Sequence, residues 1–178
     1  MEYVAGAVVL LTGALYVYIL ISMTQIAAGT ERAKAAEVMA ACACFNLRKA
    51  TRAVTQMYDD ALRSTGLRAT QFTLLTFLSG LGSVRITDLA KAVGMDYTTL
   101  VRNLNLLERD GLAASHSAED GRVREVSATA RGQRALAAAL PLWEKAQARI
   151  AKDLGRDRLG RLLSDLSATA TPTRAHTT

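Results

Sequence analysis

From Met39 onward, apolar side chains recur every three to four residues, which is the spacing of one helix face. The first such stretch, Cys44–Thr65, predicts a long helix that Gly66 would end, because glycine readily adopts the left-handed conformation that closes helices. Thr70 is a suitable N-cap for a second helix over Gln71–Leu81. The pattern therefore predicts a mainly α-helical protein.

Two short helices joined by a tight turn are expected next. Thr87 would cap a helix over Asp88–Val93, which Gly94 would end. Asp96 would then cap a further helix over Tyr97–Asp110. Two helices joined by a tight turn that contains glycine are typical of the helix-turn-helix motif.

Strand signals lie on both sides of this helix pair. Val84–Ile86 is a short extended stretch, and Leu112–Ser117 can pair with Arg122–Ser127 around a polar tip. Asp120-Gly121 in that tip is a strong hairpin signal, because its turn needs residues that tolerate positive φ. A hairpin placed directly after a helix-turn-helix is a wing. The predicted fold class is thus mainly α with a small β-hairpin wing.

The C-terminal part is again predicted to be helical. Thr129 would cap a long helix through Lys152, which Pro141 should kink or split because proline has no backbone N–H. Gly155 would break the chain before a last helix over Asp157–Ala168.

The N-terminal residues follow a different pattern. No charged side chain lies between Tyr3 and Thr30, and the apolar run Val4–Ile26 is long enough to cross a bilayer as a helix. Because Arg32 and Lys34 follow this run, the positive-inside rule would leave the rest of the chain in the cytoplasm. This interpretation makes the segment an inner-membrane anchor.

The same segment has other interpretations. A translation start at Met23 or Met39 would leave it out of the working protein. A secretory signal fits poorly, because Glu2 stands where such a signal is basic. A core helix is least favoured, because a helix that is apolar all round needs a larger protein to cover it.

Composition adds a weak indication of a polyanionic partner. The chain of 178 residues has a formal net charge of +6, which is compatible with nucleic acid or with an anionic membrane surface. Between Arg85 and Arg134, however, there are eight basic and seven acidic side chains. Binding there must depend on where the charges point rather than on their sum.

The residues that could carry catalysis or bind a metal are scarce. Cys42 and Cys44 are too close in sequence for an unstrained bridge, so a disulfide framework is excluded. His116 and His176 are the only histidines, and neither a metal-ligand spacing nor a nucleophile–histidine arrangement can be defended. We therefore expect no enzyme, no metal and no cofactor.

Several motifs occur in one order along the chain. They are G-L-x-x-x-Q-F-x-x-L from Gly66, L-x-R-x-L-x-x-L-E-x-x-G-L from Leu100, D-x-R from Asp120 and T-x-x-G from Thr129. In this order and spacing, the stretch from about Cys42 to Leu166 resembles the MarR family of winged helix-turn-helix transcriptional regulators. The chain departs from the family at Val101, where Ser or Thr is usual, and at Ala128, where Leu is usual.

The resemblance implies binding of double-stranded DNA through the helix after Asp96 and through the wing. Along that helix Leu100, Leu104 and Leu107 form a packing stripe, and another stripe projects elsewhere, made of Thr98, Arg102, Asn105 and Arg109. The candidate DNA contacts are Thr98, Thr99, Arg102, Asn103, Arg122 and Arg124. For each of these the alternative is a capping role or an ordinary solvated surface residue.

The chemistry of these residues suits DNA. Hydroxyl groups and backbone N–H groups at a helix N-terminus favour phosphate. Arg and Asn side chains can read guanine and adenine edges in the major groove, and arginine in a wing can enter the minor groove or bind phosphate. In the family the wing aspartate positions the wing arginine, which assigns Asp120 to Arg122.

The resemblance also implies a homodimer, with N- and C-terminal helices of two chains interlocked. The C-terminal helices carry more apolar side chains than one winged domain can bury, and these are Leu136, Leu140, Trp143, Ile150, Leu154, Leu159, Leu162, Leu163 and Leu166. An ordinary intramolecular core is the alternative. A two-fold symmetric dimer predicts a pseudo-palindromic DNA site.

Two switches follow from the resemblance. Family members commonly release DNA when a small phenolic or amphipathic ligand enters the cleft between dimer helices and winged domain, and repression is their commoner mode. Some sense peroxides through a cysteine followed by Phe, which matches Cys44, with a tyrosine matching Tyr58. The second usual tyrosine is replaced by Arg48, and a thiol without chemistry is the alternative.

The expected organisation follows. Residues 1–30 are the apolar segment, 31–40 a linker, 41–168 the winged-helix domain with its dimerisation helices, and 169–178 a disordered tail. The DNA-binding part is 67–128. The predicted function is a cytoplasmic, ligand-responsive repressor. A thiol-based sensor and a protein-binding winged helix without DNA function are the alternatives.

Overall fold

The computed structural model describes residues 29–117 and 124–170, and it divides into two compact units, Met1–Ala53 and Val54–Thr178. In the first unit residues 29–41 are helical, so the predicted linker over 31–40 is in fact a helix. Within the two described ranges, no helix has the length and apolarity needed to cross a bilayer. The apolar run Val4–Ile26 lies outside them.

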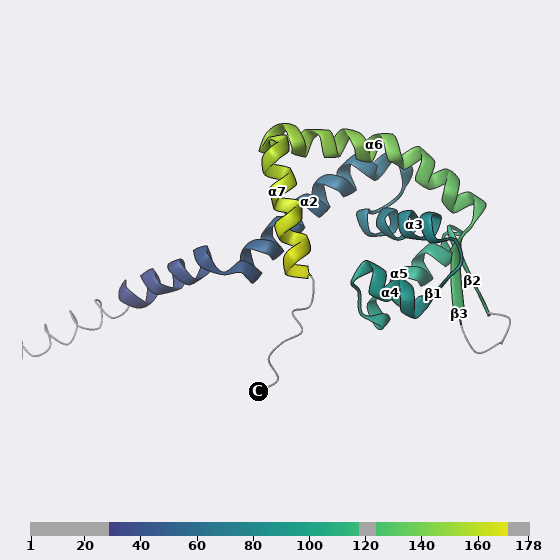
Figure 1. Cartoon of the computed structure of the whole chain (residues 1–178), viewed down its shortest axis with the longest axis horizontal. Helices are drawn as coiled ribbons and strands as arrows, with labels where there is room; N and C mark the ends of the chain where they lie inside the picture. The colour runs from purple at the N-terminus through teal and green to yellow at the C-terminus, as the bar shows by residue number, and fades with distance from the viewer. Residues whose placement is uncertain (1–28, 118–123, 171–178) are drawn as a thin grey trace, which may run out of the picture. The chain divides into compact units, whose positions relative to one another are not determined.

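The elements follow the predicted order (Figure 1). They are α2 (Ala43–Leu62), the 3-10 turn η1 (Arg63–Thr65), α3 (Ala69–Leu81), β1 (Val84–Arg85), α4 (Ile86–Val93), α5 (Tyr97–Arg109), β2 (Ala113–Ser117), β3 (Arg124–Ala128), α6 (Ala130–Leu154) and α7 (Arg156–Ala170). The helix-turn-helix, the wing strands and the C-terminal helices are therefore confirmed. The tail predicted to be disordered from residue 169 is still helical as far as Ala170.

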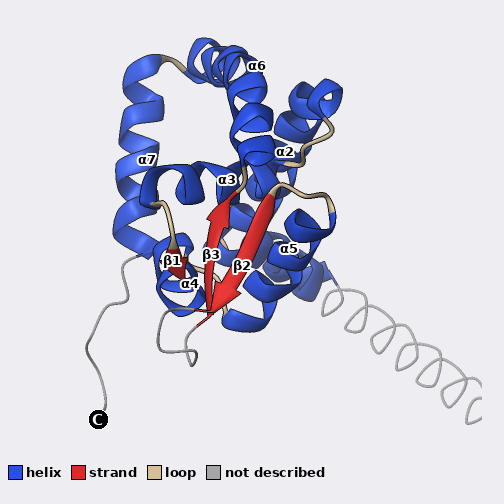
Figure 2. Cartoon of the chain, turned by 90° about the vertical axis from the view of Figure 1, so that its right-hand side faces the viewer, coloured by secondary structure: helices blue, strands red, loops and turns tan. Residues whose placement is uncertain are grey.

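A three-stranded antiparallel sheet lies beside the helices (Figure 2), in the order β1-β3-β2. Val126 on β3 is fully buried and is opposite both Val84 of β1 and Ser115 of β2. The extended stretch predicted around Val84 is thus a third strand. Its pairing with β3 ties the segment before α4 to the wing.

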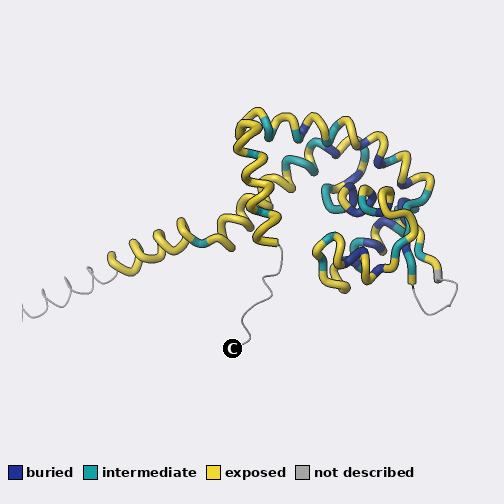
Figure 3. Tube along the Cα trace, viewed as in Figure 1, coloured by how far each residue is buried: buried dark blue, intermediate teal, exposed yellow. Residues whose placement is uncertain are grey.

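The core of the second unit comes from α3, α4, α5 and β3, with one side of α6 packed on it (Figure 3). The predicted stripe on α5 is confirmed, because Leu100, Leu104 and Leu107 are buried. Leu136 and Trp143 on α6, predicted to lie in a dimer interface, belong to this core or pack against it. Trp143 stacks on Phe72, with the ring centroids 6.1 Å apart.

The start of α3 differs from the prediction. The helix begins at Ala69, so Thr70 is not its cap. Instead the Gln71 side chain accepts the N–H of Arg68 at 3.0 Å, and Asp59 of α2 accepts the N–H of Ala69 at 2.7 Å. A carboxylate at a helix N-terminus satisfies a free donor and interacts favourably with the helix dipole. Asp59, rather than Thr70, thus caps the start of α3.

Two further helix predictions need correction. α4 begins at Ile86, and Arg85 precedes it without a side-chain hydrogen bond, so Thr87 lies inside the helix and does not cap it. Pro141 does not split α6, which runs unbroken from Ala130 to Leu154. Pro141 itself is exposed, and buried Ala139 and Ala146 lie before and after it along the helix.

Candidate nucleic-acid interface

The turn between α4 and α5 is built by two residues. Gly94 has φ 68°, a left-handed backbone conformation that residues other than glycine rarely adopt. Its N–H donates to carbonyls in the last turn of α4. Asp96 is the N-cap of α5, as predicted, and its carboxylate accepts the N–H of Thr99 at 2.9 Å. Hydrogen bonds from the Thr99 side chain and backbone lower the pKa of Asp96 below its usual value.

One face of α5 is free of the core and carries polar side chains. Thr98, Arg102, Asn105 and Arg109 are all exposed, whereas the leucine stripe on the other side is buried. Among the described residues, no acidic side chain pairs with Arg102. Its five N–H donors are therefore available to a base edge or a phosphate.

Asn103 is placed differently from Arg102. It is half-buried, and its amide donates to the carbonyl of Thr99 at 2.8 Å. It also lines a cavity together with Thr70 and Leu106. The amide of Asn103 is therefore already bonded within α5. Contact of Asn103 with a base stays a prediction.

Asn105 was not among the candidate DNA contacts, although its position is as open as that of Arg102. It lies on the same stripe as Thr98 and Arg102, and its side chain is exposed. The three- and four-residue spacing along α5 is the signal that identifies it.

The N-terminal turn of α5 supports only part of its predicted role. The side chains of Thr98 and Thr99 are exposed, as contact with DNA requires. The backbone N–H of Thr99 is already bound by Asp96. Contact with phosphate by these threonines, which stays a prediction, would therefore rest more on their hydroxyl groups than on that N–H.

The wing is joined to α5 through Glu108. Its carboxylate accepts a hydrogen bond from the Ser115 hydroxyl on β2 and lies 3.4 Å from the Arg124 guanidinium on β3. Arg124, predicted to contact DNA, is thus engaged within the protein, although half of its side chain is exposed. Arg122 and Asp120 lie outside the described residues.

A second polar group joins β1 to the wing. The Ser83 hydroxyl, just before β1, donates to Glu125 of β3 at 2.6 Å and lies 2.9 Å from Nε2 of His116 on β2. No local pattern identifies Ser83, because its partners His116 and Glu125 are distant in the chain. This group fixes the three strands relative to one another.

The candidate redox residues have separate surroundings. Cys44 is exposed, while Cys42 is half-buried and its Sγ accepts the N–H of Phe45 at 3.5 Å in the first turn of α2. The Tyr58 hydroxyl donates to Gln147 of α6, and burial raises the pKa of Tyr58. Within 29–117 and 124–170, no group of three or more His, Cys, Asp or Glu could hold a metal ion.

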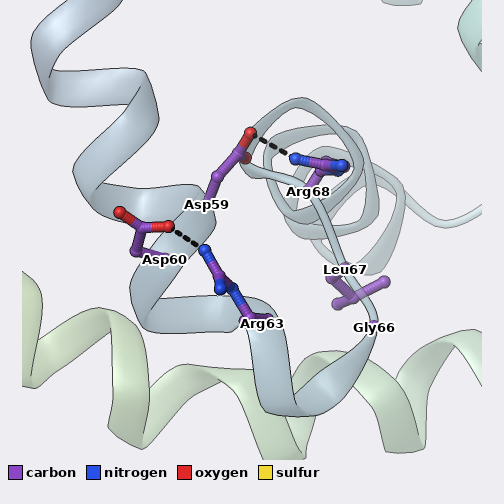
Figure 4. Close-up of a pocket in the computed structure, with 6 residues that line it drawn as sticks. All are labelled: Asp59, Asp60, Arg63, Gly66, Leu67 and Arg68. Atoms are coloured by element: carbon purple, nitrogen blue, oxygen red, sulfur yellow. Dashed lines mark hydrogen bonds and ion pairs between the residues drawn. The ribbon is translucent and has the colours of Figure 1, made fainter.

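A charged hollow lies where α2 meets α3 (Figure 4). Asp59 pairs with Arg68 at 3.1 Å, and Asp60 pairs with Arg63. Both cations in this hollow are therefore neutralised by a carboxylate. The hollow presents no unpaired charge to an ionic ligand.

Comparison with known proteins agrees with this geometry. The MarR family profile matches residues 65–123, which include the helix-turn-helix. The M. tuberculosis transcriptional regulator MosR, solved in complex with DNA, is 38% identical, with a TM-score of 0.67 over 75% of this chain and 99% of MosR. No curated protein sequence matches the chain.

A second solved relative is the transcriptional repressor CouR of Rhodococcus jostii RHA1. It is 25% identical in a structure bound to a 23-mer DNA duplex, with a TM-score of 0.68 over 75% of this chain and 95% of CouR. It is also 25% identical in a structure bound to p-coumaroyl-CoA, with a TM-score of 0.69 over 76% of this chain and 96% of CouR. With the exposed stripe on α5 and the wing beside it, these likenesses show that the chain belongs to the MarR family of DNA-binding transcriptional regulators.

Proposed function

We propose that this regulator is a repressor that binds a pseudo-palindromic operator as a homodimer and releases it when a small amphipathic ligand binds. The observation that carries DNA recognition is the exposed stripe Thr98, Arg102 and Asn105 on the helix that follows the turn at Gly94. A helix in this position enters the major groove in other helix-turn-helix proteins. The winged domain would act in the cytoplasm, where it meets DNA.

Unburied apolar side chains support the homodimer. Leu163 on α7 is 50% exposed and Leu162 is 43% exposed. In the first unit, Phe45 and Leu47 are each 41% exposed. Removing apolar side chains from water is favourable in free energy. A second copy of the chain is therefore expected to cover them. Two-fold symmetry would then place two α5 helices about one DNA turn apart.

Support for repression and for a ligand comes from CouR, which is described as a repressor and has been solved with p-coumaroyl-CoA. That compound has an apolar aromatic group and a polar, charged remainder. We therefore expect an effector of amphipathic character here.

The first test is equilibrium binding of the full-length chain to DNA from upstream of its own gene, across a series of salt concentrations. We expect on the order of a thousandfold preference over random DNA of the same length, with affinity falling steeply as salt rises. Arg102→Ala should reduce this preference roughly tenfold or more. Arg134→Ala, which removes the same charge from the exposed side of α6, should not.

The opposite results would be equally informative. Binding without preference and with weak salt dependence would contradict the proposal and favour a winged helix that binds protein. An equal effect of the two arginine variants would remove Arg102 from the recognition surface.

Thiol sensing is a second candidate function. The observation that favours it is the exposed Cys44 thiol in the first turn of α2, which a peroxide can reach. Peroxide should release DNA from the natural protein, and Cys44→Ser should abolish this release if Cys44 is the sensor. Release that persists in Cys44→Ser but not in Cys42→Ser would move the role to Cys42.

A further inference from the structure

Gln71, in the first turn of α3, is a polar side chain enclosed by the core of the second unit. In the part of the chain that the structure describes, it is the one buried residue with a polar side chain. Its neighbours on α3 include Phe72, Leu74 and Leu75, which are also buried. A polar group in such surroundings is costly unless it is hydrogen-bonded, so the partners of Gln71 indicate its role.

Both ends of the Gln71 amide are bonded. Its Oε1 accepts the N–H of Arg68 at 3.0 Å, and its Nε2 donates to Oδ2 of Asp110 at 3.3 Å. A backbone N–H can only donate and a carboxylate can only accept, so this orientation of the amide is the one that satisfies both partners. The side chain thus joins the start of α3 to the end of α5.

Asp110 is the C-cap of α5, and its contacts fix this end of the recognition helix. Its backbone N–H donates to the carbonyl of Leu106 at 3.0 Å. Its other carboxylate oxygen accepts the Nε of Arg109 at 3.4 Å. Arg109 belongs to α5 itself, whereas Gln71 belongs to another helix. The bond to Gln71 is therefore the polar contact that ties the end of α5 to α3.

The chain directly after Asp110 is held by α6 instead. The Thr129 hydroxyl donates to the carbonyl of Gly111 at 2.7 Å, and the Thr129 N–H donates to the carbonyl of Leu112 at 3.0 Å. These bonds fix the connection to the wing. Gln71 acts one residue earlier, on the cap of the helix.

The other contacts of α5 with the core are apolar, through Leu100, Leu104 and Leu107. Apolar burial is not directional, whereas a hydrogen bond weakens steeply when its angle changes. We propose that Gln71 is a positioning residue for DNA recognition. Through Asp110 it sets the rotation and the axial position of α5, and thereby the reach of Arg102 and its neighbours on the exposed stripe.

This role affects specific DNA more than random DNA. A side chain that reads a base edge must be held within about 0.5 Å of its productive position. Attraction to phosphate changes only gradually with distance. Loss of the Gln71–Asp110 bond should thus lower the affinity for upstream DNA and leave the affinity for random DNA little changed. Because specific recognition is involved, the inference rests on the proposed operator binding.

Two substitutions of Asp110 separate its hydrogen bond from its charge. In Asp110→Asn the amide oxygen can still accept from Gln71, whereas Asp110→Ala loses both the charge and the acceptor. In competition between upstream and random DNA at fixed salt, Asp110→Asn should keep the preference of the natural protein within about twofold, and Asp110→Ala should lose roughly tenfold. Equal preference in the two variants would overturn the proposal, because the hydrogen bond would then have no effect.

Reversing the direction of the bond tests the pair itself. Gln71→Glu keeps an acceptor for the Arg68 N–H but sets a carboxylate against Asp110, so the preference should fall roughly tenfold or more. Adding Asp110→Asn gives this carboxylate an amide donor and restores the net charge of the natural protein. The double variant should therefore recover the preference of Asp110→Asn. Gln133→Glu, at an exposed position on α6, is the control for the added charge.

A double variant that stays as impaired as Gln71→Glu, while its thermal unfolding matches that of the natural protein, would contradict the proposal. An equal loss of preference in Gln133→Glu and Gln71→Glu would do the same. If Gln71→Glu does not fold, the two Asp110 variants decide the matter.

Hydrogen exchange of the DNA-free protein separates this proposal from operator binding. The amides of residues 110–112 should exchange faster in Asp110→Ala than in Asp110→Asn, because the end of α5 is no longer held by α3. This difference, in a natural protein without preference for upstream DNA, would contradict the operator and leave the link between α3 and α5 standing. A natural protein that prefers upstream DNA, with neither exchange nor preference changed in Asp110→Ala, would overturn the role of Gln71 alone.

Discussion

At the residue scale, two asparagines on α5 differ in their surroundings. Asn103 is half-buried with its amide bonded to the Thr99 carbonyl, whereas Asn105 is exposed on the stripe that carries Arg102. An amide that is already bonded within its own helix must lose that bond before it can bind a base. The two residues therefore form a matched pair for testing which side of α5 faces DNA.

We predict that Asn105→Ala lowers the preference for the upstream DNA roughly tenfold, because an asparagine–adenine contact is lost. Asn103→Ala should change it much less. Competition with random DNA at fixed salt measures both variants. A larger loss for Asn103→Ala would mean that α5 turns a different side to the groove.

Glu108 is the residue whose effect on DNA binding is least intuitive. Its negative charge lies on the recognition helix, so its removal should strengthen the attraction to phosphate. However, the same carboxylate holds Ser115 and Arg124 of the wing. We expect the fixed geometry of the wing to matter more for specific DNA than the loss of one charge.

For Glu108→Gln we therefore predict unchanged or tighter binding to random DNA and a preference for upstream DNA that falls roughly fivefold, as for a partly exposed ion pair. Asp153→Asn removes one charge from an exposed ion pair on α6 and serves as the control. Tighter binding to both kinds of DNA in Glu108→Gln would show that Glu108 acts only through its charge.

At the element scale, the first turn of α6 lies close to the backbone of Leu112, directly before β2. A Cβ atom on Gly132 would overlap the carbonyl oxygen of Leu112 and come within 3.1 Å of Leu75. Thr129 in the same turn donates to the carbonyl of Gly111 at 2.7 Å. The T-x-x-G motif is thus explained, because the threonine caps α6 and the glycine lets the helix contact the backbone directly before the wing.

Gly132→Ala should lower the free energy of unfolding by about 2 kcal/mol, because backbone must move to admit the methyl group. Gly160→Ala on α7 has nothing within 4 Å of the added atom and should raise it by about 0.5 kcal/mol. Denaturation by urea measures both values. Equal stability of the two variants would mean that α6 can shift without cost.

At the scale of the whole molecule, the proposed homodimer depends on apolar side chains that are exposed in the single chain. α7 has no buried residue within one chain, yet Leu162 and Leu163 lie on it. The core of the second unit is complete without them. Their burial by a second copy would couple dimerisation to DNA binding, since one copy can occupy only one half-site.

We predict that Leu163→Glu converts the dimer to a monomer and weakens binding to the upstream DNA by at least tenfold, because a charge cannot be buried unpaired in the interface. Ser164→Glu adds the same charge at the neighbouring exposed position and should leave the dimer intact. Sedimentation equilibrium measures the mass of each variant. A dimeric Leu163→Glu protein would remove α7 from the interface.

The sequence by itself determined the order of the elements and the helix-turn-helix. Leucine spacing on α5 is a local signal, and the caps Asp96 and Thr129 bind N–H groups only three residues away. The motifs that resemble the MarR family lie in the same local stretches. The leucine spacing, the caps and the motifs all depend on residues that are close in sequence. They can therefore be recognised without the tertiary structure.

Only the tertiary structure decided which polar side chains are free. Asp59 accepts a hydrogen bond at the start of α3 from a residue ten positions away. Glu108 pairs with Arg124, sixteen positions away, and Gln71 donates to Asp110, thirty-nine positions away. No local pattern predicts these partners, because each depends on how distant segments pack. The same packing pairs Arg124 with Glu108 but leaves Arg102 without an acidic partner among the described residues, a difference that residue type alone does not predict.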